Sequence, residues 1–194
     1  MTVRAMFLSP ATGPALRAAR FDDGSALDEH GIARARAVAG AVPRASRRFT
    51  APSRRCRETA AALGISPEPE PAAGLADLDV GRWRGLGLDE VAVAEPEAVA
   101  AWLGDPGAAP HGGESVLALV GRVGAWLDGL GDGDGRVLAV AEPAVIRAAV
   151  VHALALPPET FWRLDVQPLT LTALSGRAGR WNLRCGEALG STTP

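Results

Sequence analysis

The chain has 194 residues, of which 47% are hydrophobic and 22% charged, and its formal net charge at pH 7 is −2. This length suits one domain with a buried core, so a single domain is expected over residues 1–194. The small net charge gives no reason to expect nucleic acid or an anionic membrane as a partner. Because neither a signal peptide nor a membrane-spanning stretch is recognisable, the expected location is cytoplasmic.

Short apolar runs and helical patterns alternate along the chain. In order, we expect a strand at 3–8, a helix from 25–28 to Pro43, a strand at 47–51, a helix at 54–63, one or two helices at 88–103, a helix at 115–130, a strand at 137–141, a helix at 143–156, and a hairpin of strands at 169–174 and 180–184. Ser53 is a candidate N-cap for the helix at 54–63, and Pro96 is expected to break the segment 88–103. The proline-rich segment 65–74 is expected to be a surface connection, and residues 186–194 a flexible tail. This alternation predicts an α/β protein, a three-layer α/β/α sandwich with a C-terminal hairpin.

The segment 137–156 contains the most informative residue. Five apolar residues lead into Glu142 and Pro143, and a buried helical pattern follows. In open α/β sheets, ligands bind at the carboxyl ends of the strands. The Glu142 carboxylate is therefore expected to face a ligand pocket. No group of His, Cys, Asp and Glu has the spacing of a metal site, so neither a metal nor a cofactor is expected.

Five motifs occur in one order along the chain. They are SALDEHG at 25–31, APSRRCRETA at 51–60, LADLDVGRWRG at 75–85, PHGGES at 110–115 and VLAVAEPAVIR at 137–147. In this order and spacing, they resemble the histidine phosphatase superfamily, also called phosphoglycerate mutase-like, over about residues 3–185. The resemblance implies a phosphoglycerate mutase-like fold with a mostly parallel central sheet.

The catalytic positions depart from the pattern of that family. The resemblance implies an Arg-His-Gly triplet after the first strand, with the histidine as nucleophile, and this chain has Ser9, Pro10 and Ala11 there. A second histidine, which would contact the transferred phosphoryl group, corresponds to Glu142. Proline has no nucleophilic side chain, and a carboxylate repels a phosphate. The phospho-histidine mechanism is therefore expected to be absent, which makes this a degenerate member.

Two acids and one arginine remain as candidates for chemistry. By the resemblance, Arg55 corresponds to a phosphate-binding arginine, and Asp77 to the acidic proton donor. We expect Arg55 and Glu142 to form an ion pair across the pocket floor, and we take Glu142 and Asp77 as candidate acid/base groups. The candidate ligand-binding residues are Arg55, Ser9, Thr12, Trp83 and His111.

Three functions stay open at this point. The first is a pseudoenzyme that binds a small molecule in the former phosphatase pocket, or a protein partner. The second is an enzyme with a repurposed active site, a lyase, isomerase, cyclase or hydrolase of specialised metabolism, in which Arg55 anchors a carboxylate-bearing ligand. The third is residual phosphatase activity through an unrecognised nucleophile. Members of the family that the chain resembles are frequently homodimers, so a homodimer is a further expectation.

Overall fold

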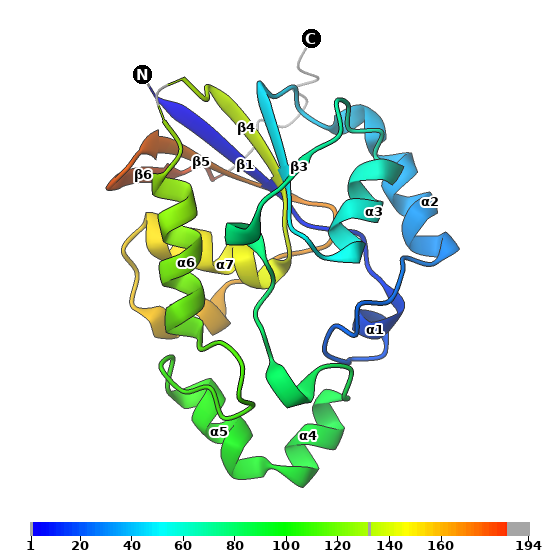
Figure 1. The fold of residues 1–194 in the computed structure, drawn as a ribbon, viewed down its shortest axis with the longest axis vertical. Coiled ribbons are helices and arrows are strands. Elements are labelled where there is room, and N and C mark those ends of the chain that lie inside the picture. Colours follow the sequence, from blue (N-terminus) through cyan, green and yellow to red (C-terminus); the bar gives the residue numbers. More distant parts are fainter. Residues whose placement is uncertain (1, 132, 186–194) are drawn as a thin grey trace.

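The computed structural model describes residues 2–131 and 133–185, and its centre is a sheet with the strand order β3-β2-β4-β1-β5-β6 (Figure 1). The strands are β1 (Val3–Leu8), β2 (Arg47–Thr50), β3 (Glu70–Pro71), β4 (Arg136–Val140), β5 (Leu171–Arg177) and β6 (Arg180–Leu183). The pairs β1–β4, β4–β2 and β2–β3 are parallel, whereas β5 runs antiparallel to both β1 and β6. The predicted mostly parallel sheet with a C-terminal hairpin is confirmed.

Helices cover both faces of this sheet. They are α1 (Pro14–Arg17), α2 (Glu29–Ala37), α3 (Arg54–Ala62), α4 (Leu88–Ala94), α5 (Pro96–Gly104), α6 (Val116–Asp128) and α7 (Pro143–Ala153), with the 3₁₀ turns η1 (Ala39–Ala41), η2 (Ala73–Leu75), η3 (Gly81–Trp83) and η4 (Pro158–Arg163). Helix α2 packs with α3, and α6 with α7, and the two pairs lie on opposite sides in Figure 1. The three-layer α/β/α prediction is thereby confirmed. Across the described residues, every helix is too short or too polar to cross a bilayer.

Several predicted elements have the wrong bounds or type. The strand expected at 169–174 lies at Leu171–Arg177, and the helix expected at 143–156 ends at Ala153. The helix expected to continue to Pro43 ends at Ala37 and gives way to η1, because Gly40 disfavours a continued α-helix. The segment 65–74, expected to be only a connection, contains β3, which pairs with β2 through Glu70 and Pro71. An edge strand can hold a proline there because its missing N–H is not needed on the open side. The expected tail at 186–194 lies outside the described residues.

The helix starts follow local capping chemistry. The Ser53 hydroxyl accepts a hydrogen bond from the Cys56 backbone N–H (3.2 Å), as the predicted cap of α3 requires. The Asp28 carboxylate does the same at the start of α2, with the Gly31 N–H at 2.9 Å. Pro96 starts α5 and so separates it from α4, as its position predicts.

The contact between α6 and α7 depends on one glycine. A Cβ atom added at Gly124 would lie 2.2 Å from Nδ1 of His152, whereas one at Gly121 on the same helix would meet no atom within 4 Å. We expect Gly124→Ala to lower the free energy of unfolding by about 1–3 kcal/mol through overpacking. Gly121→Ala should raise it by about 0.5–1 kcal/mol, since alanine is the better helix former. Urea unfolding of both variants checks this, and a stabilised Gly124→Ala would contradict it.

Candidate functional site

The site lies at the edge of the sheet where the parallel strands end. Strand β1 leads into Ser9, β2 leads to Ser53 and Arg55 at the start of α3, and β4 leads into Glu142 before α7. Because parallel strands present their carboxyl ends on one edge, residues distant in sequence meet there.

Arg55 and Glu142 form a buried ion pair. Only 11% of the Arg55 side chain and 1% of the Glu142 side chain are exposed. One Nη2 contact to Glu142 Oε2 and one Nε contact to Oε1 at 3.3 Å join the guanidinium to the carboxylate. Burial opposes the charge on Arg55, but the neighbouring Glu142 carboxylate keeps the pKa of Arg55 above its usual value. The ion pair predicted from the sequence is confirmed.

Ser53 completes this network, and sequence reasoning gave it only a capping role. Its Oγ donates to Glu142 Oε1 at 2.8 Å while accepting from the Cys56 N–H. Glu142 is thus held by one hydroxyl and one guanidinium. These are groups that bind an oxyanion well, so the carboxylate takes the place that a bound anion would take.

Asp77 is the second predicted acid, and its environment differs from that of Glu142. Its half-buried carboxylate accepts a hydrogen bond from the Leu78 N–H at 2.8 Å. Burial, followed by the negative charge of Glu142, raises the pKa of Asp77 to about 7, although Arg55 acts in the opposite direction. Near neutral pH, the Asp77 carboxyl is therefore protonated in a fraction of the protein molecules.

A third carboxylate belongs to the same electrostatic group, and sequence reasoning assigned it no role. Burial and the charge of Glu142 raise the pKa of Asp22, which also accepts from the Gly24 N–H at 3.2 Å. An exposed arginine, Arg84, lies 4.0 Å away. The one sequence signal for Asp22 was its position after Phe21, where the resemblance to the family implies a loop over the pocket. Among the described residues, no group of three or more His, Cys, Asp or Glu could hold a metal ion.

Ser9 and Thr12 lie at the end of β1. Ser9 is fully buried, and its Oγ donates to the Gln167 carbonyl at 2.5 Å and accepts from the Thr170 N–H at 3.0 Å. This hydroxyl therefore fixes the loop before β5. Thr12 is half-buried, and its backbone carbonyl accepts from the Arg17 guanidinium at 3.1 Å. Neither side chain has a hydrogen bond to the Arg55–Glu142 pair among the contacts of the described residues.

Trp83 and His111 lie in an aromatic cluster together with Phe21, Trp102 and Trp162. Both are fully buried, with ring centroids 5.0 Å apart. Trp83 Nε1 donates to Glu95, and His111 Nδ1 accepts from the Gly113 N–H. Burial lowers the pKa of His111. Because Phe21 and Leu78 pack on this cluster, it supports the two chain segments that carry Asp22 and Asp77.

A mostly parallel sheet between two pairs of helices, with charged side chains at its carboxyl edge, defines a three-layer α/β protein of the phosphoglycerate mutase-like kind. A model of the histidine phosphatase superfamily (branch 1) matches residues 15–187. The chain belongs to the histidine phosphatase superfamily.

Solved structures of phosphatases resemble this fold. The mycobacterial glucosyl-3-phosphoglycerate phosphatase Rv2419c, solved with VO3, has a TM-score of 0.83 and 26% identity, with 93% of this chain and 96% of that chain covered. Phosphoserine phosphatase from Entamoeba histolytica has a TM-score of 0.83 at 16% identity, with 94% and 95% covered. Alpha-ribazole phosphatase from Shigella flexneri has a TM-score of 0.80 at 18% identity, with 93% and 94% covered. The last two support the fold alone. No curated protein matched the chain.

Proposed function

We propose that this superfamily member does not transfer phosphoryl groups through a histidine, and that its pocket binds a small molecule without a phosphate group. One observation carries the proposal: the Glu142 carboxylate occupies the donors of Arg55 and Ser53. Arg55 is the arginine that the family resemblance assigns to phosphate binding. Pro10 follows β1 at the position of the nucleophile and cannot accept a phosphoryl group.

The charge of the site supports the same proposal. Asp22, Asp77 and Glu142 influence one another electrostatically, and Arg55 is the buried cation among them. A phosphate monoester carries up to two negative charges and depends on cations that neutralise them in the transition state. A neutral or cationic ligand meets less repulsion here. A carboxylate-bearing ligand, expected from Arg55 alone, would have to displace Glu142 from the guanidinium.

A second candidate function is acid/base catalysis by Asp77 and Glu142. One specific observation favours it: the two carboxyl groups lie in opposite environments. Arg55 and Ser53 contact the Glu142 carboxyl, whereas burial and the charge of Glu142 raise the pKa of Asp77 to about 7. An acid whose pKa lies near neutral pH can donate or accept a proton under physiological conditions. An Asp77 that is fully ionised at pH 6 would remove this candidate.

Turnover of a generic phosphomonoester across about pH 4–9 tests the main proposal. We expect no activity above background from the wild type or from Arg55→Ala, with a conventional histidine phosphatase assayed in parallel as the positive control. Wild-type turnover that Arg55→Ala abolishes would contradict the proposal, because it would require an unrecognised nucleophile. A thermal-shift screen of phosphate-free small molecules then searches for the ligand, with Asp77→Asn as the site variant.

A further inference from the structure

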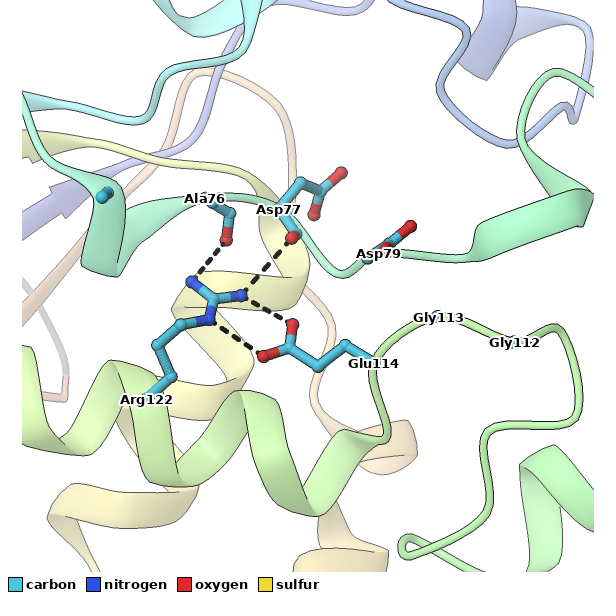
Figure 2. A pocket seen from close by; sticks show the side chains of 8 residues that line it. Ala76, Asp77, Asp79, Gly112, Gly113, Glu114 and Arg122 are labelled. Atoms are coloured by element: carbon cyan, nitrogen blue, oxygen red, sulfur yellow. Dashed lines mark hydrogen bonds and ion pairs between the residues drawn. The ribbon is translucent and has the colours of Figure 1, made fainter.

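We infer that Arg122 of α6 is a positioning residue for Asp77: it holds the backbone of residues 74–77 so that the Asp77 carboxyl is directed toward Arg55 and Glu142. The inference rests on the proposed function in one respect only, namely that Asp77 is a functional group of the pocket. The Arg122 guanidinium contacts one side of the segment 74–77, and the Asp77 carboxyl lies on the other side (Figure 2).

One guanidinium binds several carbonyls of the segment that delivers Asp77. Arg122 Nη1 donates to the Gly74 carbonyl at 3.1 Å and to the Ala76 carbonyl at 3.0 Å, and Nη2 reaches the Asp77 carbonyl at 3.4 Å. Figure 2 shows the Asp77 carbonyl pointing to Arg122 while its carboxyl extends the other way. Because the backbone sets the direction of the Cα–Cβ bond, holding these carbonyls limits where the Asp77 carboxyl can lie.

The guanidinium is itself held in orientation by Glu114. Nε and Nη2 of Arg122 donate to the two Glu114 carboxylate oxygens, at 2.9 and 2.7 Å. The Glu114 backbone N–H in turn donates to the Asp79 carbonyl at 2.7 Å. Arg122 and Glu114 thus hold the segment on both sides of Asp77. Only a planar, multi-donor fork can satisfy a carboxylate and three carbonyls together, which a lysine ammonium cannot do.

Packing fixes the start of this segment: η2 contacts α6, with Leu75 fully buried and Gly74 against Trp126. The backbone bonds that Leu75 and Ala76 donate close the single turn η2, and the segment takes no part in the sheet. A cavity of about 420 Å³ opens beside it, lined by residues that include Asp77, Glu114 and Arg122. Beyond this packed turn, the hydrogen bonds of Arg122 hold the Ala76 and Asp77 carbonyls.

The test is the titration of the Asp77 carboxyl, followed by carbon-13 NMR and assigned with Asp77→Asn. In the wild type, the midpoint is expected at about 7, in a field set by Glu142, Arg55 and Asp22. In Arg122→Ala, the carboxyl turns toward water, and the midpoint should fall by about one pH unit or more. Arg122→Lys should lower the Asp77 midpoint by a smaller amount. This variant serves as the test if Arg122→Ala does not fold.

Arg147→Ala is the matched control, because Arg147 is also a half-buried arginine that donates to a backbone carbonyl, that of Leu164 at 2.8 Å. It should leave the Asp77 midpoint unchanged. A folded Arg122→Ala or Arg122→Lys with the wild-type midpoint would overturn the inference. If Arg122→Ala lowers the midpoint but the wild type hydrolyses a generic phosphomonoester and Arg55→Ala abolishes that turnover, the positioning role stands and the proposed function fails.

Discussion

Replacing Glu142 with alanine should create an anion site that the wild-type protein lacks. The change leaves the Arg55 guanidinium and the Ser53 hydroxyl, which both bind Glu142, without that acceptor. Since the Arg55 side chain is 11% exposed, its attraction for an anion is screened less by solvent than that of a surface arginine. We expect Glu142→Ala to bind inorganic phosphate or sulfate with a Kd of about 1 mM or tighter, equivalent to about −4 kcal/mol.

The stability of the same variant should depend on phosphate. Removing one partner of a buried ion pair typically costs about 3–5 kcal/mol, because the remaining charge is left uncompensated. Phosphate at about 100 times its Kd should return about 2.7 kcal/mol of this loss. Urea unfolding with and without phosphate, at matched ionic strength in sodium chloride, measures both quantities.

Glu70→Ala is the control for this prediction, because Glu70 pairs with Arg47 on the surface, where 68% and 46% of the two side chains are exposed. Its loss should change the free energy of unfolding by no more than about 1 kcal/mol, with no response to phosphate. If Glu142→Ala gains no affinity for phosphate or sulfate, Glu142 is not what excludes anions, and the main support for the proposed function is lost.

Asp77→Asn should make the protein more stable above pH 7 and leave it nearly unchanged near pH 4. The pKa of Asp77 is raised from its ordinary value of 3.8 to about 7, first by burial and then by Glu142. Between these values, the folded state binds more protons at this position than the unfolded state. The wild type therefore loses stability as the pH rises through this window, whereas the asparagine variant avoids that loss.

The size of the effect is bounded. One pKa unit corresponds to about 1.4 kcal/mol, so the whole shift sets an upper limit of about 4 kcal/mol. We expect less, since water reaches part of the Asp77 side chain. Urea unfolding of wild type and variant at several values between about pH 4 and 8 measures the difference. Asp79→Asn, an exposed neighbour on the same segment, should retain the pH dependence of the wild type. An Asp77→Asn protein with that same pH dependence would contradict the prediction.

The sequence predicted the helices and strands whose sequence signals lie within one short segment of the chain. The apolar runs of β1 and β4, the Ser53 cap and the break at Pro96 each depend on side-chain periodicity or turn chemistry over one short segment. The same sequence placed Glu142 at the end of β4, and the family pattern placed Arg55 opposite it. Their ion pair could therefore be predicted.

The remaining parts of the site depend on contacts between distant segments. The Ser53–Glu142 hydrogen bond spans 89 positions in the sequence, and the contact between Arg122 and the Asp77 carbonyl spans 45. The inclusion of Asp22 among the coupled carboxyl groups likewise follows from burial beside Glu142. No periodicity encodes such pairs, because they arise only where packed elements bring side chains together.

The sequence by itself determined the α/β class, most of the strands and helices, and an acid and an arginine at the carboxyl edge of the sheet. Only the tertiary structure decided which donors hold Glu142, why Asp77 keeps its proton near neutral pH, and that Ser9 anchors the loop before β5. The physical reason is that burial and charge neighbours set the ionisation and hydrogen bonding of a side chain, and these are properties of the packed chain.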